Sequence, residues 1–198
     1  IIKYTHPGYN DVVNIVVWLP NIASWTGRLL GASGGEFTAG PETNATLAWA
    51  ASEGFAVVST DGGHVAEFAM DMEKWAFRSR RDIDWIQLQS WSSTALEDAA
   101  KLGKEVVRAY YGKPPTYSYF NGCSIGGRQG YQLAQRYPNQ YNGILAPAPA
   151  IFWNEYLMQI FWPLAVMHDL GEAPIKAFSS LSTAELTLHR GISNYLGV

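Results

Sequence analysis

The chain has 198 residues, of which 47% are apolar and 16% charged, and a net charge of −3. This composition is typical of a folded protein with one sizeable core and excludes a disordered chain. The sequence shows no basic surface for nucleic acid, no apolar run long enough for a membrane span, and no visible secretion leader.

Short β-prone runs alternate with helical patterns along the first 150 residues. The expected strands cover residues 12–19, 29–30, 55–59, 116–120 and 142–146. The expected helices cover residues 45–53, 94–111 and 125–137, and residues 65–89 are expected to form loops and short turns. This alternation predicts an α/β fold, with a mostly parallel sheet covered by helices on both faces.

Two helix starts carry a capping signal. Asn44 can cap the first helix, and the sequence Thr-Ala-Leu-Glu at 94–97 has the pattern of a capping box. The helix that follows it has one apolar face, made of Leu96, Ala99, Ala100, Gly103, Val107 and Tyr110.

The character of the chain changes after Pro149. Residues 151–170 are rich in Trp, Phe, Met and Leu and are interrupted by Pro163, which is compatible with a kinked helix pair, a lid or core. Residues 174–191 predict a weakly amphipathic helix. We therefore expect a core domain over 1–150 and the start of a helical, lid-like segment over 151–198.

The most informative motif is Gly-x-Ser-x-Gly, centred on Ser124 between an aromatic β-prone run and a helical pattern. This layout predicts a nucleophile elbow, a sharp turn that exposes the serine hydroxyl above the sheet. Cys123 is a poorer candidate for the nucleophile, because Asn121 and Ile125 stand where its flanking glycines would be needed.

A hydrolytic serine needs amide donors for the oxyanion of the intermediate. One is expected to be the N–H of Ile125, the residue after the nucleophile. The second is assigned to Gly35, with Gly34 as the alternative, in the glycine-rich segment 31–35. A simple β-turn remains an open interpretation of that segment.

The general base is harder to place. In this architecture an acid and then a histidine follow the serine, and Asp169 with His189 is the only pair we weigh there, although neither follows an expected strand. Asp61 and His64 follow the strand at 55–59, and we expect them to shape the site floor through hydrogen bonds.

Several sequence blocks point to one family. They are Trp-Thr-Gly-Arg at 25–28 with the glycine-rich loop, Ser-Thr-Asp-Gly-Gly-His at 59–64, Leu-Gly-Lys at 102–104, Gly-Cys-Ser-Ile-Gly-Gly-Arg-Gln-Gly at 122–130, Ala-Gln-Arg-Tyr-Pro at 134–138, Tyr-Asn-Gly-Ile at 141–144, and Ala-Pro-Ala at 148–150 with Trp153. Over about residues 12–184 the chain resembles the tannase and feruloyl esterase family, and the region of Trp162 and Pro163 looks most like its fungal members. The resemblance implies an α/β-hydrolase-type fold and a secreted serine esterase that cleaves phenolic-acid esters through an acyl-enzyme.

The family pattern also implies what this chain lacks. Cys123 would form a disulfide with a cysteine that is absent here, and the catalytic acid and histidine are absent as well. We expect an incomplete chain that stops before the lid and the later strands, with a further segment or partner chain supplying the acid and histidine. No cofactor is expected for catalysis and no metal site in this chain; structural calcium is expected only in the missing lid. Asn44 lies in a glycosylation sequon.

Two other readings of function remain open. One is a catalytically inactive remnant that keeps an aromatic-binding surface. The other is a lipase-like or peptidase-like hydrolase that uses Asp169 and His189. If the protein is the serine esterase that the resemblance implies, its expected partner is a small phenolic ester, and neither nucleic acid nor a membrane is expected.

Overall fold

The structure is a computed structural model that describes residues 1–41 and 43–169. The chain divides into two compact units, residues 1–150 and residues 151–198. A lid role for the second unit stays a prediction.

A six-stranded sheet forms the centre of the first unit. Its strands, in spatial order, are β1 (Ile2–Tyr4), β2 (Val13–Trp18), β4 (Phe55–Thr60), β3 (Arg28–Ala32), β7 (Tyr117–Asn121) and β8 (Gly143–Leu145). β1, β2 and β4 pair antiparallel, whereas β4, β3, β7 and β8 pair parallel. The predicted strands are confirmed, and β1, only three residues long, is an addition.

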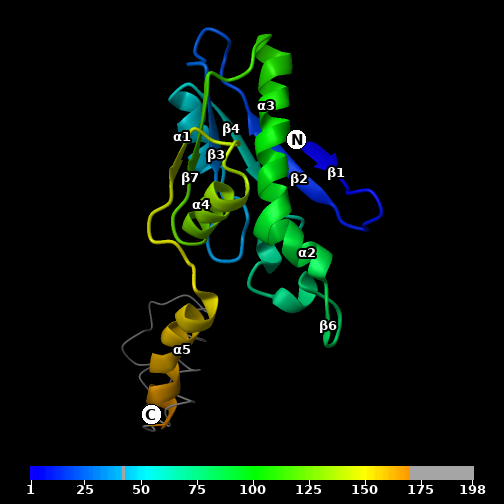
Figure 1. The fold of residues 1–198 in the computed structure, drawn as a ribbon, viewed down its shortest axis with the longest axis vertical. Helices are drawn as coiled ribbons and strands as arrows, with labels where there is room; N and C mark the ends of the chain where they lie inside the picture. The colour runs from blue at the N-terminus through cyan, green and yellow to red at the C-terminus, as the bar shows by residue number, and fades with distance from the viewer. Residues whose placement is uncertain (42, 170–198) are drawn as a thin grey trace. The chain divides into compact units, whose positions relative to one another are not determined.

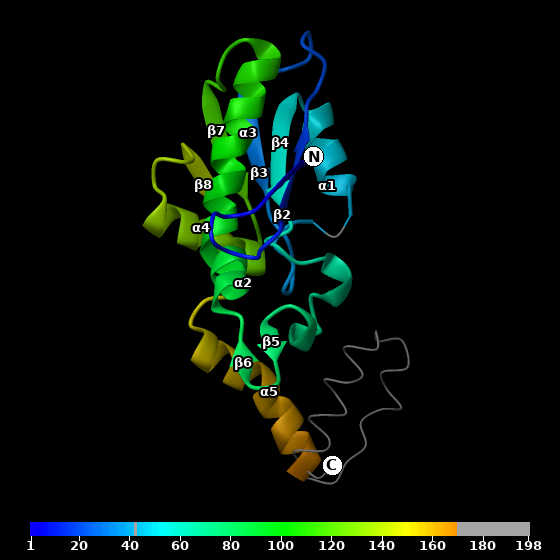
Figure 2. The ribbon, with the colours of Figure 1, turned by 90° about the vertical axis from the view of Figure 1, so that its right-hand side faces the viewer.

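Helices cover both faces of this sheet, as predicted. Helix α1 (Ala45–Ser52) lies on one face, and α3 (Ala95–Tyr111) and α4 (Ile125–Arg136) lie on the other (Figures 1 and 2). The segment between β4 and α3 contains, in chain order, η1 (Ala66–Phe68), η2 (Met72–Lys74), the hairpin β5 (Phe77–Ser79) and β6 (Asp82–Ile83), α2 (Trp85–Gln89) and the π-helix η3 (Ser90–Thr94).

The strand period of two divides the core between the faces. Leu29 and Val58 pack with Val107 on the α3 face, whereas their neighbours Leu30 and Val57 pack on the α1 face. All five of these side chains are buried. Buried hydrophobic side chains on both faces are what a central parallel sheet requires.

Three sequence predictions about the helices need correction. Thr94 has helical backbone angles and its side chain makes no capping hydrogen bond, because the π-helix η3 leads directly into α3. The capping box is therefore wrong, and Glu97 instead pairs with Lys101 at 2.7 Å. Tyr110 is 51% exposed, so it does not belong to the buried face of α3. Asn44 precedes α1 as predicted but makes no side-chain cap bond.

The described part of the second unit is helix α5 (Trp153–Asp169). Pro163 lies inside this helix, so of the alternatives for this segment the kinked helix pair is wrong, and the described residues form one helix. Met158 and Trp162 are exposed on it. The helix predicted at 174–191 lies outside the described residues.

Candidate active site

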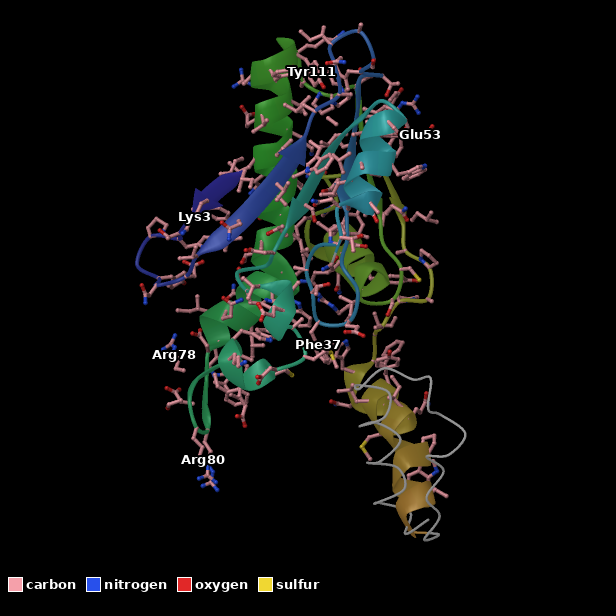
Figure 3. The ribbon with its side chains drawn as sticks, turned by 180° about the vertical axis from the view of Figure 1, so that it is seen from behind. Lys3, Phe37, Glu53, Arg78, Arg80 and Tyr111 are labelled. Atoms are coloured by element: carbon pink, nitrogen blue, oxygen red, sulfur yellow. The ribbon has the colours of Figure 1, made fainter. Side chains whose placement is uncertain are left out.

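The candidate site is built where three parallel strands end at the same edge of the sheet. In the strand register Ala32 of β3 lies opposite Asn121 of β7, and Gly31 lies opposite Val58 of β4. The loops that follow these strands therefore start side by side. Figure 3 shows Phe37, in the loop after β3, beyond this edge of the sheet and Tyr111 near the opposite edge.

Ser124 forms the sharp turn between β7 and α4. Its backbone adopts φ 60° and ψ −117°, and its side chain is exposed. A positive φ is strained for a residue with a side chain and costs on the order of 1–3 kcal/mol. The geometry of the predicted elbow is therefore present: an exposed hydroxyl on a strained residue between a strand and a helix.

The two glycines of the motif are required by close packing. A Cβ at Gly122 would lie 2.5 Å from the carbonyl oxygen of Gly126 and 2.6 Å from Oγ of Ser33. A Cβ at Gly126 would collide with Ser33 as well. The loop after β3 thus lies directly against the elbow, which the sequence could not show.

Backbone hydrogen bonds hold the elbow from two sides. The carbonyl oxygen of Ser124 accepts from Arg128 N at 3.1 Å, inside α4, and from Ala150 N at 3.0 Å, in the segment after β8. The Gly122 N–H donates to Leu145 O at 3.0 Å. Ile125 is the first residue of α4, where amide groups have no acceptor within the helix. Its N–H is therefore suited to bind an oxyanion beside Ser124.

The loop after β3 favours Gly34 over Gly35 as the second amide donor. The N–H of Gly35 already donates to Oγ1 of Thr38 at 3.0 Å. In the part of the chain that the structure describes, the N–H of Gly34 has no acceptor. A Cβ at Gly34 would collide with Thr38 and Gly40, whereas one at Gly35 would meet nothing within 4 Å. Packing therefore requires glycine at 34 and not at 35.

Asp61 and His64 both have partners inside the fold. Asp61 accepts from the backbone N–H of Asn14 at 2.9 Å, from its side-chain amide at 2.6 Å, and from Gly63 N at 2.8 Å. His64 Nε2 lies 2.9 Å from the carbonyl oxygen of Phe37, and its ring stacks on Trp75 at 4.1 Å.

Burial lowers the pKa of His64, so its imidazole is neutral near pH 7 and Nε2–H is the donor to that carbonyl group. This hydrogen bond to Phe37 thus stabilises the position of the loop after β3. Together with Asp61, His64 also lines an open cleft at this edge of the sheet.

The remaining predicted site residues are placed as follows. Cys123 is an exposed free thiol, and Asn44 is exposed at the start of α1. Asp169 is the last residue of α5, but its side chain is not described, and His189 lies outside the described residues. The disulfide, the glycosylation and the Asp169–His189 pair all stay predictions.

The sequence did not predict the role of three side chains near the loop after β3, namely Arg128, Gln129 and Trp91. The Gln129 side-chain amide donates to Ala39 O at 2.9 Å, and Arg128 lies over the ring of Trp91, with its Cζ 4.6 Å from the ring centroid. Arg128 and Gln129 belong to the motif block at 122–130, yet no local pattern indicates their contacts. Trp91 stands in the unpredicted π-helix, a feature often associated with functional sites.

A family model described as "Tannase and feruloyl esterase" matches residues 1–183. The chain belongs to the tannase and feruloyl esterase family. It is 40% identical over 168 residues to a probable feruloyl esterase of Arthroderma benhamiae, covering 85% of this chain and 31% of that protein. It is 30% identical over 152 residues to a tannase of Aspergillus oryzae, covering 75% of this chain and 25% of that protein. The chain thus spans less than a third of the length of these relatives.

Solved structures agree with this family assignment. The tannin acyl hydrolase from Aspergillus niger superposes with a TM-score of 0.71 at 26% identity, over 86% of this chain and 30% of that chain. An esterase from Aspergillus oryzae gives a TM-score of 0.69 at 25% identity, over 85% of this chain and 31% of that chain. The fold is of the α/β-hydrolase type, as the sequence predicted.

The described residues form neither a membrane-spanning helix nor a cluster of metal-binding side chains. None of their helices combines the length and apolar character needed to cross a bilayer. Within residues 1–41 and 43–169, no group of three or more His, Cys, Asp or Glu side chains could hold a metal ion.

Proposed function

We propose that the protein is a carboxylic ester hydrolase in which Ser124 is the nucleophile. The observation that carries the proposal is the exposed side chain of Ser124 at φ 60°, between β7 and the first turn of α4. Family membership supports the same class of reaction, because relatives with this domain are named feruloyl esterase and tannase.

The chemistry follows from the groups at the sheet edge. Oγ of Ser124 attacks the ester carbonyl carbon, its proton passes to a general base, and the carbonyl oxygen becomes an oxyanion. The amides of Ile125 and Gly34 stabilise that oxyanion, with Gly35 as the weaker candidate because Thr38 already occupies its N–H. The alcohol leaves with the proton, and water then releases the acid from the acyl-enzyme and restores the serine.

The general base is proposed to be a histidine oriented by an acid. A further segment of the protein, or a partner chain, would supply both groups. The disulfide would then join Cys123 to that segment and hold the histidine near Ser124, which fits the exposed thiol beside the nucleophile. Structural calcium is proposed only for the lid, and no cofactor takes part in the reaction.

The proposed substrates are small esters of phenolic acids such as ferulate or gallate. The names of the relatives support this class. Secretion is part of the same proposal, with Asn44 as the glycosylation site.

Covalent labelling with a fluorophosphonate tests the nucleophile directly. We expect labelling of the wild-type protein at Ser124, none in Ser124→Ala, and unchanged labelling in Cys123→Ser. Hydrolysis of methyl ferulate and methyl gallate then tests the substrate class. A folded wild-type protein that resists the probe would instead be the inactive remnant, and loss of labelling in His189→Ala would favour the hydrolase that uses Asp169 and His189.

A further inference from the structure

Helix α4 is connected to the glycine-rich loop as well as to the nucleophile. Residues 128 and 129 directly follow the Gly-Cys-Ser-Ile-Gly-Gly segment, and their side chains have no part in the proposed reaction. The side chain of Arg128 donates a hydrogen bond to η3, and that of Gln129 donates one to the loop after β3. Their partners determine what these two side chains can do.

Gln129 holds the end of the loop that follows β3. Its side chain is fully buried, and its Nε2 donates to the carbonyl oxygen of Ala39 at 2.9 Å. Ala39 is also buried, and Gly62, in the turn after β4, packs against it so closely that a Cβ there would lie 2.7 Å from the Ala39 methyl group. A buried amide donor is costly to leave unpaired, so this bond fixes where the loop ends.

Arg128 reaches the same loop through Trp91. Its Nη1 donates to Ser92 O at 3.0 Å, and its guanidinium lies over the Trp91 ring. The Trp91 ring also lies 6.0 Å from the ring of Phe37, whose carbonyl oxygen accepts from His64. Burial lowers the pKa of Arg128 to about 10, which still leaves it charged at neutral pH. The cation–π contact compensates part of the desolvation of that charge.

We propose that Gln129 and Arg128 are positioning residues that hold the loop at 33–39 in register with the first turn of α4. The two amides proposed to bind the oxyanion lie on these two elements, Gly34 on the loop and Ile125 on the helix. Two connections from one helix, at Ala39 directly and at Phe37 through Trp91, fix the separation of those amides before substrate arrives. The inference rests on the proposed hydrolase function.

Such a role predicts a specific kinetic signature. The oxyanion develops only in the transition state, so a displaced amide lowers kcat and leaves ground-state binding nearly unchanged. Gln129→Met keeps the length of the side chain and removes the donor. We expect kcat for methyl ferulate to fall about 10- to 100-fold, with KM within about twofold. A boronic acid that forms a tetrahedral adduct with Ser124 should lose affinity by a similar factor.

The matched control is Gln132→Met, one turn further along α4. Gln132 Nε2 donates to Oγ of Ser93 at 2.9 Å, so this variant loses a similar bond outside the loop. Its kcat should stay within about twofold of wild type. Equal losses of kcat in the two variants, or an unchanged kcat in Gln129→Met, would overturn the positioning role while the esterase function stands.

Hydrogen exchange gives a second test that needs neither a variant nor activity. In the wild-type protein, peptides covering 33–40 and 125–132 should open with the same free energy, because the two elements are held together. Much faster exchange over 33–40 contradicts the proposal. A wild-type protein that hydrolyses no ester and takes no fluorophosphonate would refute the proposed function alone, since the exchange experiment still reports whether the loop and the helix are coupled.

Discussion

Two polar clusters in the first unit stand at strand ends and differ in how completely they are paired. After β1, His6 Nδ1 lies 2.5 Å from Asp11 and its Nε2 lies 3.0 Å from Asp98, which also accepts from Tyr4 at 2.8 Å. After β7, Ser124 has a strained backbone and no side-chain cap bond.

This difference separates a cluster that stabilises the fold from one that is available for chemistry. Paired groups in the His6 cluster contribute to stability, because each donor meets a carboxylate. The strained elbow costs stability and is held by the packing around it, which is common at functional sites.

The largest effect is expected from Gly126→Ala. The new Cβ would meet Ser33, so the elbow or the loop must move, at a cost of about 1–3 kcal/mol. Ester hydrolysis should fall by more than about 10³-fold, because both oxyanion amides shift. Gly35→Ala is the control, since a Cβ there meets nothing within 4 Å. Steady-state kinetics and thermal melting measure both effects, and similar behaviour of the two variants would refute this account of the motif glycines.

The next largest effect is a loss of stability when the His6 cluster is disrupted. In His6→Ala, the buried carboxylate of Asp11 loses its ring partner, and we expect about 1–3 kcal/mol of destabilisation, measured by urea unfolding. Lys101→Ala removes an exposed ion pair with Glu97 and should cost less than about 0.5 kcal/mol. If His6→Ala and Lys101→Ala destabilise the protein equally, the His6 cluster contributes no more than an ordinary surface ion pair.

A smaller effect on stability is expected at the elbow, and it is a gain instead of a loss. Ser124→Gly removes the side chain that makes φ 60° unfavourable, so the protein should gain about 1 kcal/mol, or roughly 2–4 °C in Tm, while losing activity. Ser124→Ala loses activity and keeps the strain, so its Tm should stay near that of wild type. A Tm of Ser124→Gly at or below that of Ser124→Ala would show that the elbow stores no strain.

The smallest effect is the pH dependence of the His6 contribution. The hydrogen bond to Asp11 raises the pKa of His6, so its stabilisation is complete below about pH 6.5, the ordinary value, and is lost as pH rises through the higher folded value. For Asp11, burial acts to raise the pKa, but the bonds from His6 outweigh it and lower the value. Its stabilisation is present above about pH 4 and is lost as pH falls through the lower folded value.

The difference in Tm between wild type and His6→Ala should therefore be largest between about pH 4 and 6.5 and should shrink as the pH rises above this range through the higher folded pKa of His6. Thermal melts of both proteins across and above this range measure it. A difference that grows with pH would mean that neutral His6, and not the imidazolium, makes the stabilising contacts.

Much of the fold and part of the site could be predicted from local sequence. Alternating β-prone and helical runs located β2, β3, β4, β7, β8 and three helices, because strand and helix periods are local properties. The elbow was also predictable, since a tight turn requires glycine on both sides of Ser124. Local patterns failed at Thr94, where the chain was already helical and no cap was needed.

The sequence by itself determined that the chain forms a mostly parallel α/β sheet with an exposed serine at a strand-to-helix turn. Only the tertiary structure decided which amide of the glycine-rich loop is free, because the bond from Gly35 N–H to Oγ1 of Thr38 depends on the conformation that this loop takes against its neighbours. It also decided the contact of Gln129 with Ala39, ninety residues apart, and that of His6 with Asp98, ninety-two apart. Such contacts depend on how elements pack, and a pattern with a period of two or 3.6 residues carries no information about them.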